Sequence, residues 1–163
     1  MFDHEIRDAA ERVLTSCRTH KLKIVTAESC TGGLVAAALT AIAGSSDVVD
    51  RGFVTYSNEA KHEMLGVALD TLEKHGAVSE PVARAMARGA LTHSMADISV
   101  SVTGVAGPGG GSAEKPVGLV HFAAARSGFE LIAEHHVFPG DRDGIRRLAT
   151  ITALSLLAAL AER

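Results

Sequence analysis

The octapeptide Thr-Ala-Glu-Ser-Cys-Thr-Gly-Gly, residues 26–33, determines how the rest of the chain is interpreted. It follows the apolar residues Leu22, Ile24 and Val25 and precedes the helix-like segment 34–39, so it predicts a turn from a strand into a helix. Proteins of the α/β class keep their chemistry at such turns, at the carboxyl end of a strand. The stretch therefore indicates an α/β fold with a site at this turn.

The same octapeptide carries reactive groups. Ser29 and Cys30 are candidate nucleophiles. Gly32 and Gly33 remove side chains where the N–H groups of a helix start point outward, which favours a phosphate or the oxyanion of an acyl-transfer intermediate. Ser, Thr and a Gly-Gly pair are also ordinary at a helix cap and a tight turn, so the octapeptide alone leaves both interpretations open.

Length and composition indicate one domain over residues 1–163. Hydrophobic residues make up 47% and charged residues 21% of the chain, which is typical of helices packed on a sheet. The net charge is −3 and no Lys/Arg-rich tract occurs, so a general nucleic-acid surface is disfavoured.

The chain has features of a reduced cytoplasmic protein. Cys17 and Cys30 show no disulfide or metal-ligand spacing, and residues 1–7 lack the apolar core of a signal peptide. The apolar run 149–161 is too short to span a membrane, so it predicts a buried or subunit-facing helix. We expect no membrane partner and a homo-oligomer.

Helical and strand patterns alternate along the chain. The last two expected strands flank Ser127-Gly128 as a β-hairpin. We therefore expect an α/β fold with a mixed sheet, parallel crossovers first and the hairpin later, in an undetermined strand order. Helices are expected over 4–20, 34–41, 58–65, 69–75, 80–93 and 142–162, and strands over 23–26, 50–56, 97–103, 117–125 and 129–138.

Tyr56 and Lys61 are expected in the crevice that Ser29 borders, since they lie at a strand end and in the first turn of the next helix. A lysine there faces the positive end of the helix dipole, which disfavours its charged form, and partial burial lowers its pKa further. Such a lysine can act as a base. A solvated lysine at a helix end is the alternative.

A glycine loop, residues 104–112, follows the expected strand 97–103 and contains five glycines in nine residues. Its main-chain amides could bind a phosphate. It is not a Walker loop, because no Gly-Lys-Ser/Thr follows. The match to a dinucleotide-binding fingerprint is weak, because position 112 is Ser where the third glycine belongs. A mobile surface loop is the alternative. His135 and His136 are adjacent in a strand and point to opposite faces, so no metal site is predicted.

Five motifs in order identify the chain as similar to a known family: residues 26–33, 52–61, 76–83, 103–118 and 140–142. Together they resemble the nicotinamide-nucleotide amidase family, also known as the C-terminal domain of the competence/damage-inducible protein CinA. The likeness covers nearly the whole chain. Some members of the family carry an additional N-terminal domain, for which this chain has no room, so we expect no activity that belongs to it.

The resemblance implies a deamidase that converts nicotinamide mononucleotide to nicotinic acid mononucleotide and ammonia. It also implies a serine nucleophile with a lysine, assisted by a tyrosine, and neither metal nor cofactor. These roles fall on Ser29, Lys61 and Tyr56. We hypothesise that neutral Lys61 takes the Ser29 proton and that Tyr56 orients the pair or relays the proton.

The nucleotide substrate is expected to contact the two glycine-containing stretches and one arginine of the last helix. Turn amides would hold the oxyanion, and the glycine loop with Arg142 would hold the phosphate. Glu28 would position Lys61 or offset the pyridinium charge. The expected substrate-binding residues are Glu28, Thr31, Gly32, Gly33, Thr103, Gly104, Gly107, Gly109, Gly110, Ser112 and Arg142.

Two other functions fit the residue types. In the first, Cys30 is the nucleophile of an amidase, with Glu28 and Lys61 assisting. In the second, the chain is a non-catalytic nucleotide sensor that binds phosphate through the glycine loop and Arg142. The family likeness favours Ser29 as the nucleophile.

Overall fold

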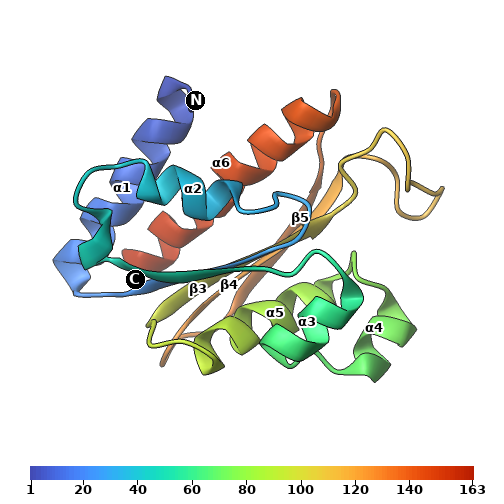
Figure 1. Ribbon diagram of the computed structural model, residues 1–163, viewed down its shortest axis with the longest axis horizontal. Coiled ribbons are helices and arrows are strands. Elements are labelled where there is room, and N and C mark those ends of the chain that lie inside the picture. Colours follow the sequence, from blue (N-terminus) through green and yellow to red (C-terminus); the bar gives the residue numbers. More distant parts are fainter.

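The octapeptide divides between a strand and a turn in the computed structural model of the chain, which describes residues 1–163 (Figure 1). Its first three residues complete β1 (Ile24–Glu28), and residues 29–33 form the turn before α2 (Leu34–Thr40). The expected strand 23–26 therefore ends two residues too early. Glu28 looks like a turn residue in the sequence, but it is fully buried at the strand end.

The sheet has five strands in the order β2-β1-β3-β4-β5. β1 pairs in parallel with β2 and β3, whereas β4 is antiparallel to both β3 and β5. The predicted mixed sheet with a C-terminal hairpin is confirmed. The other strands are β2 (Val49–Val54), β3 (Ile98–Gly104), β4 (Leu119–Arg126) and β5 (Ile132–Val137).

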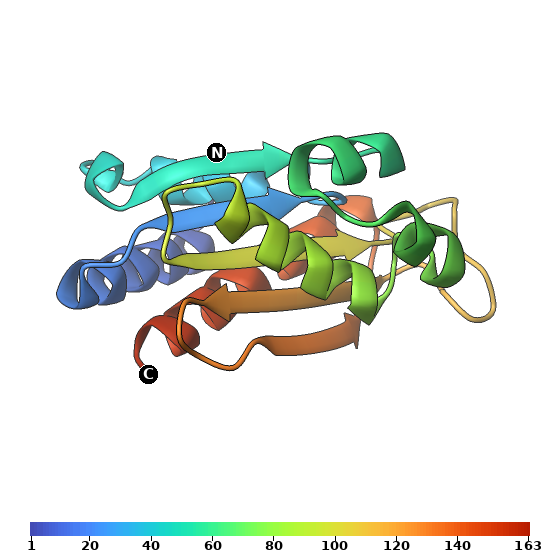
Figure 2. The same cartoon turned by 90° about the horizontal axis from the view of Figure 1, so that it is seen from below.

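Helices cover both faces of the sheet. α1, α2 and α6 lie on one face, and α3, α4 and α5 lie on the other (Figures 1 and 2). The predicted helices agree with the structure to within two residues at each end. They are α1 (His4–His20), α3 (Asn58–Leu65), α4 (Leu69–His75), α5 (Glu80–Thr92) and α6 (Arg142–Ala161), with a short 3-10 turn at Ser45–Asp47.

Apolar and hydroxyl residues alternate along β3, and each kind packs on a different face of the sheet. Val100 and its apolar neighbours on one side belong to the main core under α1 and α6. The hydroxyls of Ser99 and Ser101, on the other side, donate to the carbonyl oxygens of Ala87 and Ala83 in α5 at 2.8 and 2.6 Å. Small hydroxyl residues thus bring α5 close to the sheet while satisfying their own polar groups.

The C-terminal helix α6 is apolar and long enough to match a membrane span by length and composition. In the fold it packs against α1, β3 and β4, and its apolar side chains are central to the main core. α6 is therefore a core helix of an α/β sandwich.

One end of the sheet gathers the segments expected to carry chemistry. The carboxyl ends of β1, β2 and β3 point the same way, and the glycine loop extends from that end toward β4 (Figure 2). In α/β folds the ends of adjacent parallel strands form the crevice for ligands. The fold thus brings the turn 29–33 beside residues 55–61 and 103–107.

Gly89 is required where α5 crosses the end of α3. A Cβ atom at this position would lie 1.9 Å from the carbonyl oxygen of Leu65. In a helix, alanine is more favourable than glycine by about 1 kcal/mol. We nevertheless expect Gly89→Ala to lower the free energy of unfolding by roughly 1–3 kcal/mol, because the backbone at Leu65 must move to make room for the methyl group. Urea unfolding measures the change. Gly109→Ala is the control, because a Cβ atom at Gly109 would have no other atom within 4 Å. An equal loss of stability in both variants would contradict the close approach of α5 to Leu65.

Candidate active site

Ser29 begins the turn and lies at the edge of a pocket. Its N–H donates to the carbonyl of Val102 on β3 at 2.9 Å, and its carbonyl accepts from the N–H of Gly32 at 2.9 Å. The turn closes because Gly32 and Gly33 adopt φ of 59° and 101°, a region that side chains disfavour. Ser29 is 8% exposed, so its hydroxyl is nearly enclosed.

Glu28 serves the start of α2. The N-cap residue of this helix is Gly33, which has no side chain to cap the free N–H groups. The buried Glu28 carboxylate accepts from the N–H of Val35 at 2.9 Å and from that of Ala36 at 3.0 Å. A carboxylate at a helix N-terminus also complements the helix dipole. The hydrogen bonds of Glu28 are thus with α2 and with the Thr26 hydroxyl, which donates at 3.3 Å, and none joins it to Lys61.

Lys61 enters the same pocket from α3. The Ser57 hydroxyl caps this helix by accepting from the N–H of Ala60, and Lys61 follows in the first turn. Its Nζ lies 3.0 Å from Ser29 Oγ and donates to the carbonyl of Thr55 at 2.8 Å. The residue is 1% exposed.

No carboxylate forms an ion pair with Lys61. Burial therefore disfavours the ammonium form and lowers the pKa of Lys61, and the nearby Cys30 opposes this only weakly. A neutral amine beside a serine hydroxyl can accept its proton. The arrangement has the geometry of a base and a nucleophile.

The pocket has a volume of about 200 Å³. Apolar and small side chains form its walls, and Lys61 and Arg142 are the only lysine and arginine that line it. Its apolar wall residues Ala77, Val78 and Ala106 carry no chemical signal in the sequence, and only the fold could identify them. The lining residues are Ser29, Cys30, Tyr56, Lys61, Ala77, Val78, Thr103, Gly104, Ala106 and Arg142.

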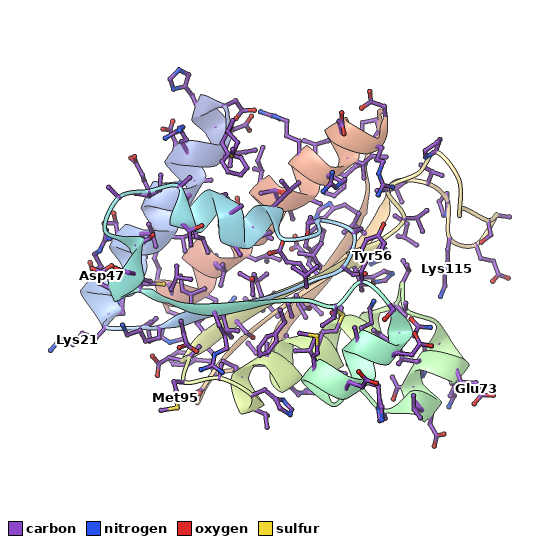
Figure 3. All side chains as sticks on the ribbon, in the orientation of Figure 1. Lys21, Asp47, Tyr56, Glu73, Met95 and Lys115 are labelled. Carbon is purple, nitrogen blue, oxygen red and sulfur yellow. The ribbon has the colours of Figure 1, made fainter.

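Tyr56 lines the same pocket as Ser29 and Lys61 but forms no hydrogen bond with either of them. Its hydroxyl accepts from Nη2 of Arg142 at 3.2 Å, and 62% of the residue is exposed. Nη1 of Arg142 donates to the carbonyl of Gly107 at 2.8 Å. Figure 3 shows Tyr56 near the ends of the strands. Arg142 therefore links Tyr56 to the glycine loop across the mouth.

The glycine loop contributes unequally to the pocket. Thr103 and Gly104 line it, whereas Gly109, Gly110 and Ser112 are exposed and lie outside the lining residues. Thr103 Oγ1 itself donates to the carbonyl of Ala77 at 2.8 Å, which holds the pocket wall.

A lysine that the sequence did not single out fixes the far side of the glycine loop. The Nζ of Lys115 donates to the carbonyl of His75 at the end of α4, at 2.6 Å (Figure 3). The outer part of the loop is thus attached to α4.

Cys30 also touches the pocket, but its thiol is poorly suited to attack. The residue is 6% exposed, and burial raises the pKa of the thiol to about 11. A thiol with that pKa is almost entirely protonated at neutral pH, whereas the thiolate is the reactive form.

The arginines of α6 separate into three roles. Arg142 lines the pocket, and Arg147 pairs with Asp3 and Glu5 at the surface, at 2.6 and 2.7 Å. Arg146 donates to two carbonyl oxygens of the turn 29–33. Only Arg142 can therefore reach a ligand in this pocket.

The fold and the pocket define an αβα sandwich with a buried serine–lysine pair at the carboxyl ends of parallel strands. Residues 6–161 match the family described as the CinA C-terminal domain, and the chain belongs to this family. A relative from Escherichia coli K12, named nicotinamide-nucleotide amidohydrolase PncC, is 54% identical over 157 residues, which cover 96% of this chain and 95% of the relative. The predicted family is thereby confirmed.

Solved structures share the fold over nearly the whole chain. The competence/damage inducible protein CihA from Agrobacterium tumefaciens superimposes with a TM-score of 0.96 at 52% identity, covering 98% of each chain. A longer relative, the putative competence-damage inducible protein of Caldicellulosiruptor bescii, is 50% identical over 152 residues, which are 93% of this chain but 37% of that protein. The domain thus occurs both alone and within longer chains.

Replacing Lys61 with methionine tests its buried, unpaired state. In the unfolded chain a lysine titrates near pH 10.4, and its lowered pKa in the fold means that the unfolded state binds more protons between the two values. Lys61→Met should therefore stabilise the protein, by about 1.4 kcal/mol per unit by which the pKa is lowered. This gain is largest below the lowered pKa and disappears toward about pH 10.4.

Urea unfolding of Lys61→Met and the parent chain at several pH values measures this difference. Lys74→Met, at an exposed lysine of α4, is the matched control and should show no such pH dependence. A stability difference for Lys61→Met that does not change with pH would contradict the lowered pKa.

Proposed function

We propose that this protein hydrolyses the carboxamide of nicotinamide mononucleotide, releasing nicotinic acid mononucleotide and ammonia. The observation that carries the proposal is the 3.0 Å separation of Lys61 Nζ and Ser29 Oγ, with the lysine buried and unpaired. The named activity of the 54% identical relative supports the substrate. A serine nucleophile with a lysine base suits an acyl-transfer reaction.

In the first half of the reaction the neutral amine of Lys61 takes the hydroxyl proton of Ser29. Ser29 Oγ then forms a bond to the carboxamide carbon, and the carbonyl oxygen becomes an oxyanion. When the carbon–nitrogen bond breaks, the Lys61 ammonium returns the proton to the leaving amine. Ammonia departs, and the nicotinoyl group stays on Ser29 as an ester.

In the second half a water molecule attacks this ester. Lys61 takes a proton from the water, the bond between the acyl carbon and Ser29 Oγ breaks, and the proton passes to Ser29. The acid leaves, and the serine and the neutral lysine are restored. One water is consumed for each amide bond cleaved.

Main-chain N–H groups of the turn would hold the oxyanion. The N–H groups of Cys30 and Thr31 donate to no other residue of the chain, and they follow Ser29 directly. In many hydrolases the N–H after the nucleophile serves in this way. We infer that the carbonyl oxygen of the substrate lies against this turn.

The pocket volume fits part of the substrate. About 200 Å³ is less than the roughly 300 Å³ that a small-molecule site usually offers, so the pyridine ring would lie inside, against Ala77, Val78 and Ala106. The ribose phosphate would then lie at the mouth beside Arg142 and Tyr56. Arginine binds phosphate through two parallel hydrogen bonds. In this proposal Lys61 carries the proton, and Tyr56 acts through Arg142.

The other functions considered from the sequence are less well supported. The raised pKa of Cys30 weakens it as the nucleophile. A sensor that only binds nucleotide has no need of a buried, unpaired lysine beside a serine, which costs stability. We further infer assembly into a homo-oligomer and a cytoplasmic location, where the buried cysteines stay free.

Ammonia release from nicotinamide mononucleotide tests the catalytic pair. Ser29→Ala should lower kcat by more than about 10³-fold, and Lys61→Ala by about 10²- to 10⁴-fold. Cys30→Ala should stay within about tenfold of the parent because its thiol is not used. Circular dichroism checks that each variant is folded. Activity that survives in Ser29→Ala and is lost in Cys30→Ala would instead identify the cysteine amidase.

Arg142→Gln tests the proposed phosphate contact. Hydrogen bonds to a charged group contribute about 1.5–3 kcal/mol, so KM should rise roughly 10- to 150-fold while kcat changes little. Arg147→Gln removes an arginine from the next turn of the same helix, outside the pocket, and should leave KM unchanged. Equal KM values for both variants would show that the phosphate binds elsewhere.

A further inference from the structure

Arg146 spans two successive peptide groups of the turn that carries Ser29. It lies one helical turn after Arg142 on α6 and is not among the residues that line the pocket. Its Nε donates to the carbonyl of Cys30 at 3.1 Å, and its Nη2 donates to the carbonyl of Thr31 at 3.2 Å. The planar guanidinium fork thus fixes the orientation of both peptide groups.

The guanidinium of Arg146 forms hydrogen bonds only with these carbonyls. No ion pair of the chain includes Arg146, whereas the adjacent Arg147 is neutralised by Asp3 and Glu5. Arg146 is also half-buried, so water screens its charge incompletely. A cation that holds a carbonyl oxygen polarises the whole peptide group and makes its N–H a stronger donor.

The geometry of a peptide group determines where that stronger donor points. In a trans peptide the C=O and the N–H point in opposite directions. Arg146 holds the Cys30 carbonyl toward α6, so the N–H of the same peptide group, which belongs to Thr31, points away from α6. This N–H has no acceptor in the chain, whereas the next one, of Gly32, donates to Ser29.

We propose that Arg146 is a positioning residue for oxyanion stabilisation, acting through the Cys30–Thr31 peptide group without touching the substrate. The inference rests on the proposed amidase function and deepens it. Arg146 fixes the Thr31 N–H before substrate arrives, so the donor need not reorient as negative charge develops on the carbonyl oxygen. Lys61 supplies the base, and Arg146 supplies the orientation of the donor.

Steady-state kinetics of Arg146→Gln test this role. Displacing an oxyanion donor lowers kcat by about 10²-fold, and KM should change by less than about threefold since Arg146 does not contact the ground-state substrate. The pH dependence of kcat should keep its shape because Lys61 is untouched. The kcat of Arg146→Lys should lie between those of the parent and Arg146→Gln, since one ammonium cannot span both carbonyls. Arg147→Gln is the control and should match the parent.

Chemical rescue separates positioning from general stability. In Arg146→Ala, free guanidinium at millimolar concentration should occupy the vacated site and restore part of kcat in a saturable manner. A residue that only stabilises the fold would show no rescue, because guanidinium weakens folded proteins. Arg147→Ala should not respond to guanidinium. A kcat of Arg146→Gln equal to that of the parent, or absence of rescue, would overturn the proposal.

Labelling by a fluorophosphonate tests the same role independently of the nucleotide. Ser29 Oγ attacks phosphorus, the P–F bond breaks, fluoride leaves, and the hydroxyl proton passes to Lys61. The phosphoryl oxygen of the adduct needs the same N–H donor, so labelling of Arg146→Gln should be slower by a similar factor. If the parent chain is labelled but releases no ammonia, the proposed substrate fails while Arg146 is still tested. Equal labelling rates, or no labelling of either chain, would overturn its role.

Discussion

Lys61 is a buried amine with no carboxylate to neutralise it, and much of the structure around it follows from that constraint. A charged lysine in this position would cost several kcal/mol in lost hydration. Burial shifts the equilibrium toward the neutral amine and so reduces this cost, and Nζ lies 3.0 Å from Ser29 Oγ. Burial lowers the pKa of Lys61, and no acidic residue lines the pocket, whose apolar wall suits a flat aromatic ring.

The turn beside Lys61 is supported from two sides by groups that do not enter the pocket. On one side the Glu28 carboxylate caps α2 in place of the side chain that Gly33 lacks. On the other, Arg146 of α6 holds two carbonyls of the turn. Because opposite charges act on the N–H and C=O groups of this segment, its main chain is oriented before any ligand binds. Positioned dipoles of this kind are a main source of enzymatic rate enhancement.

Patterns within the sequence predicted the helices, the strands and the Ser29 and Lys61 pair well. They predicted the contacts around that pair less well. Strand-end and first-turn positions brought Ser29 and Lys61 together correctly, since parallel strands end at one edge. Strand order required the fold, because periodicity identifies a buried face and not its neighbour. The partners of Tyr56 and Glu28 also required it, since both depend on where α6 and α2 pack. The exposed outer half of the glycine loop agrees with the surface-loop alternative, but composition could not tell which of its residues line the pocket.

The titration of Lys61 itself tests the central claim most directly. In protein carrying ¹⁵N-labelled lysine side chains, the Nζ resonance that disappears in Lys61→Met identifies Lys61, and its shift can be followed with pH. We expect this resonance to titrate below the value of about 10.4 for an ordinary lysine. A Lys61 resonance that titrates at about 10.4 or above would contradict a neutral amine as the base.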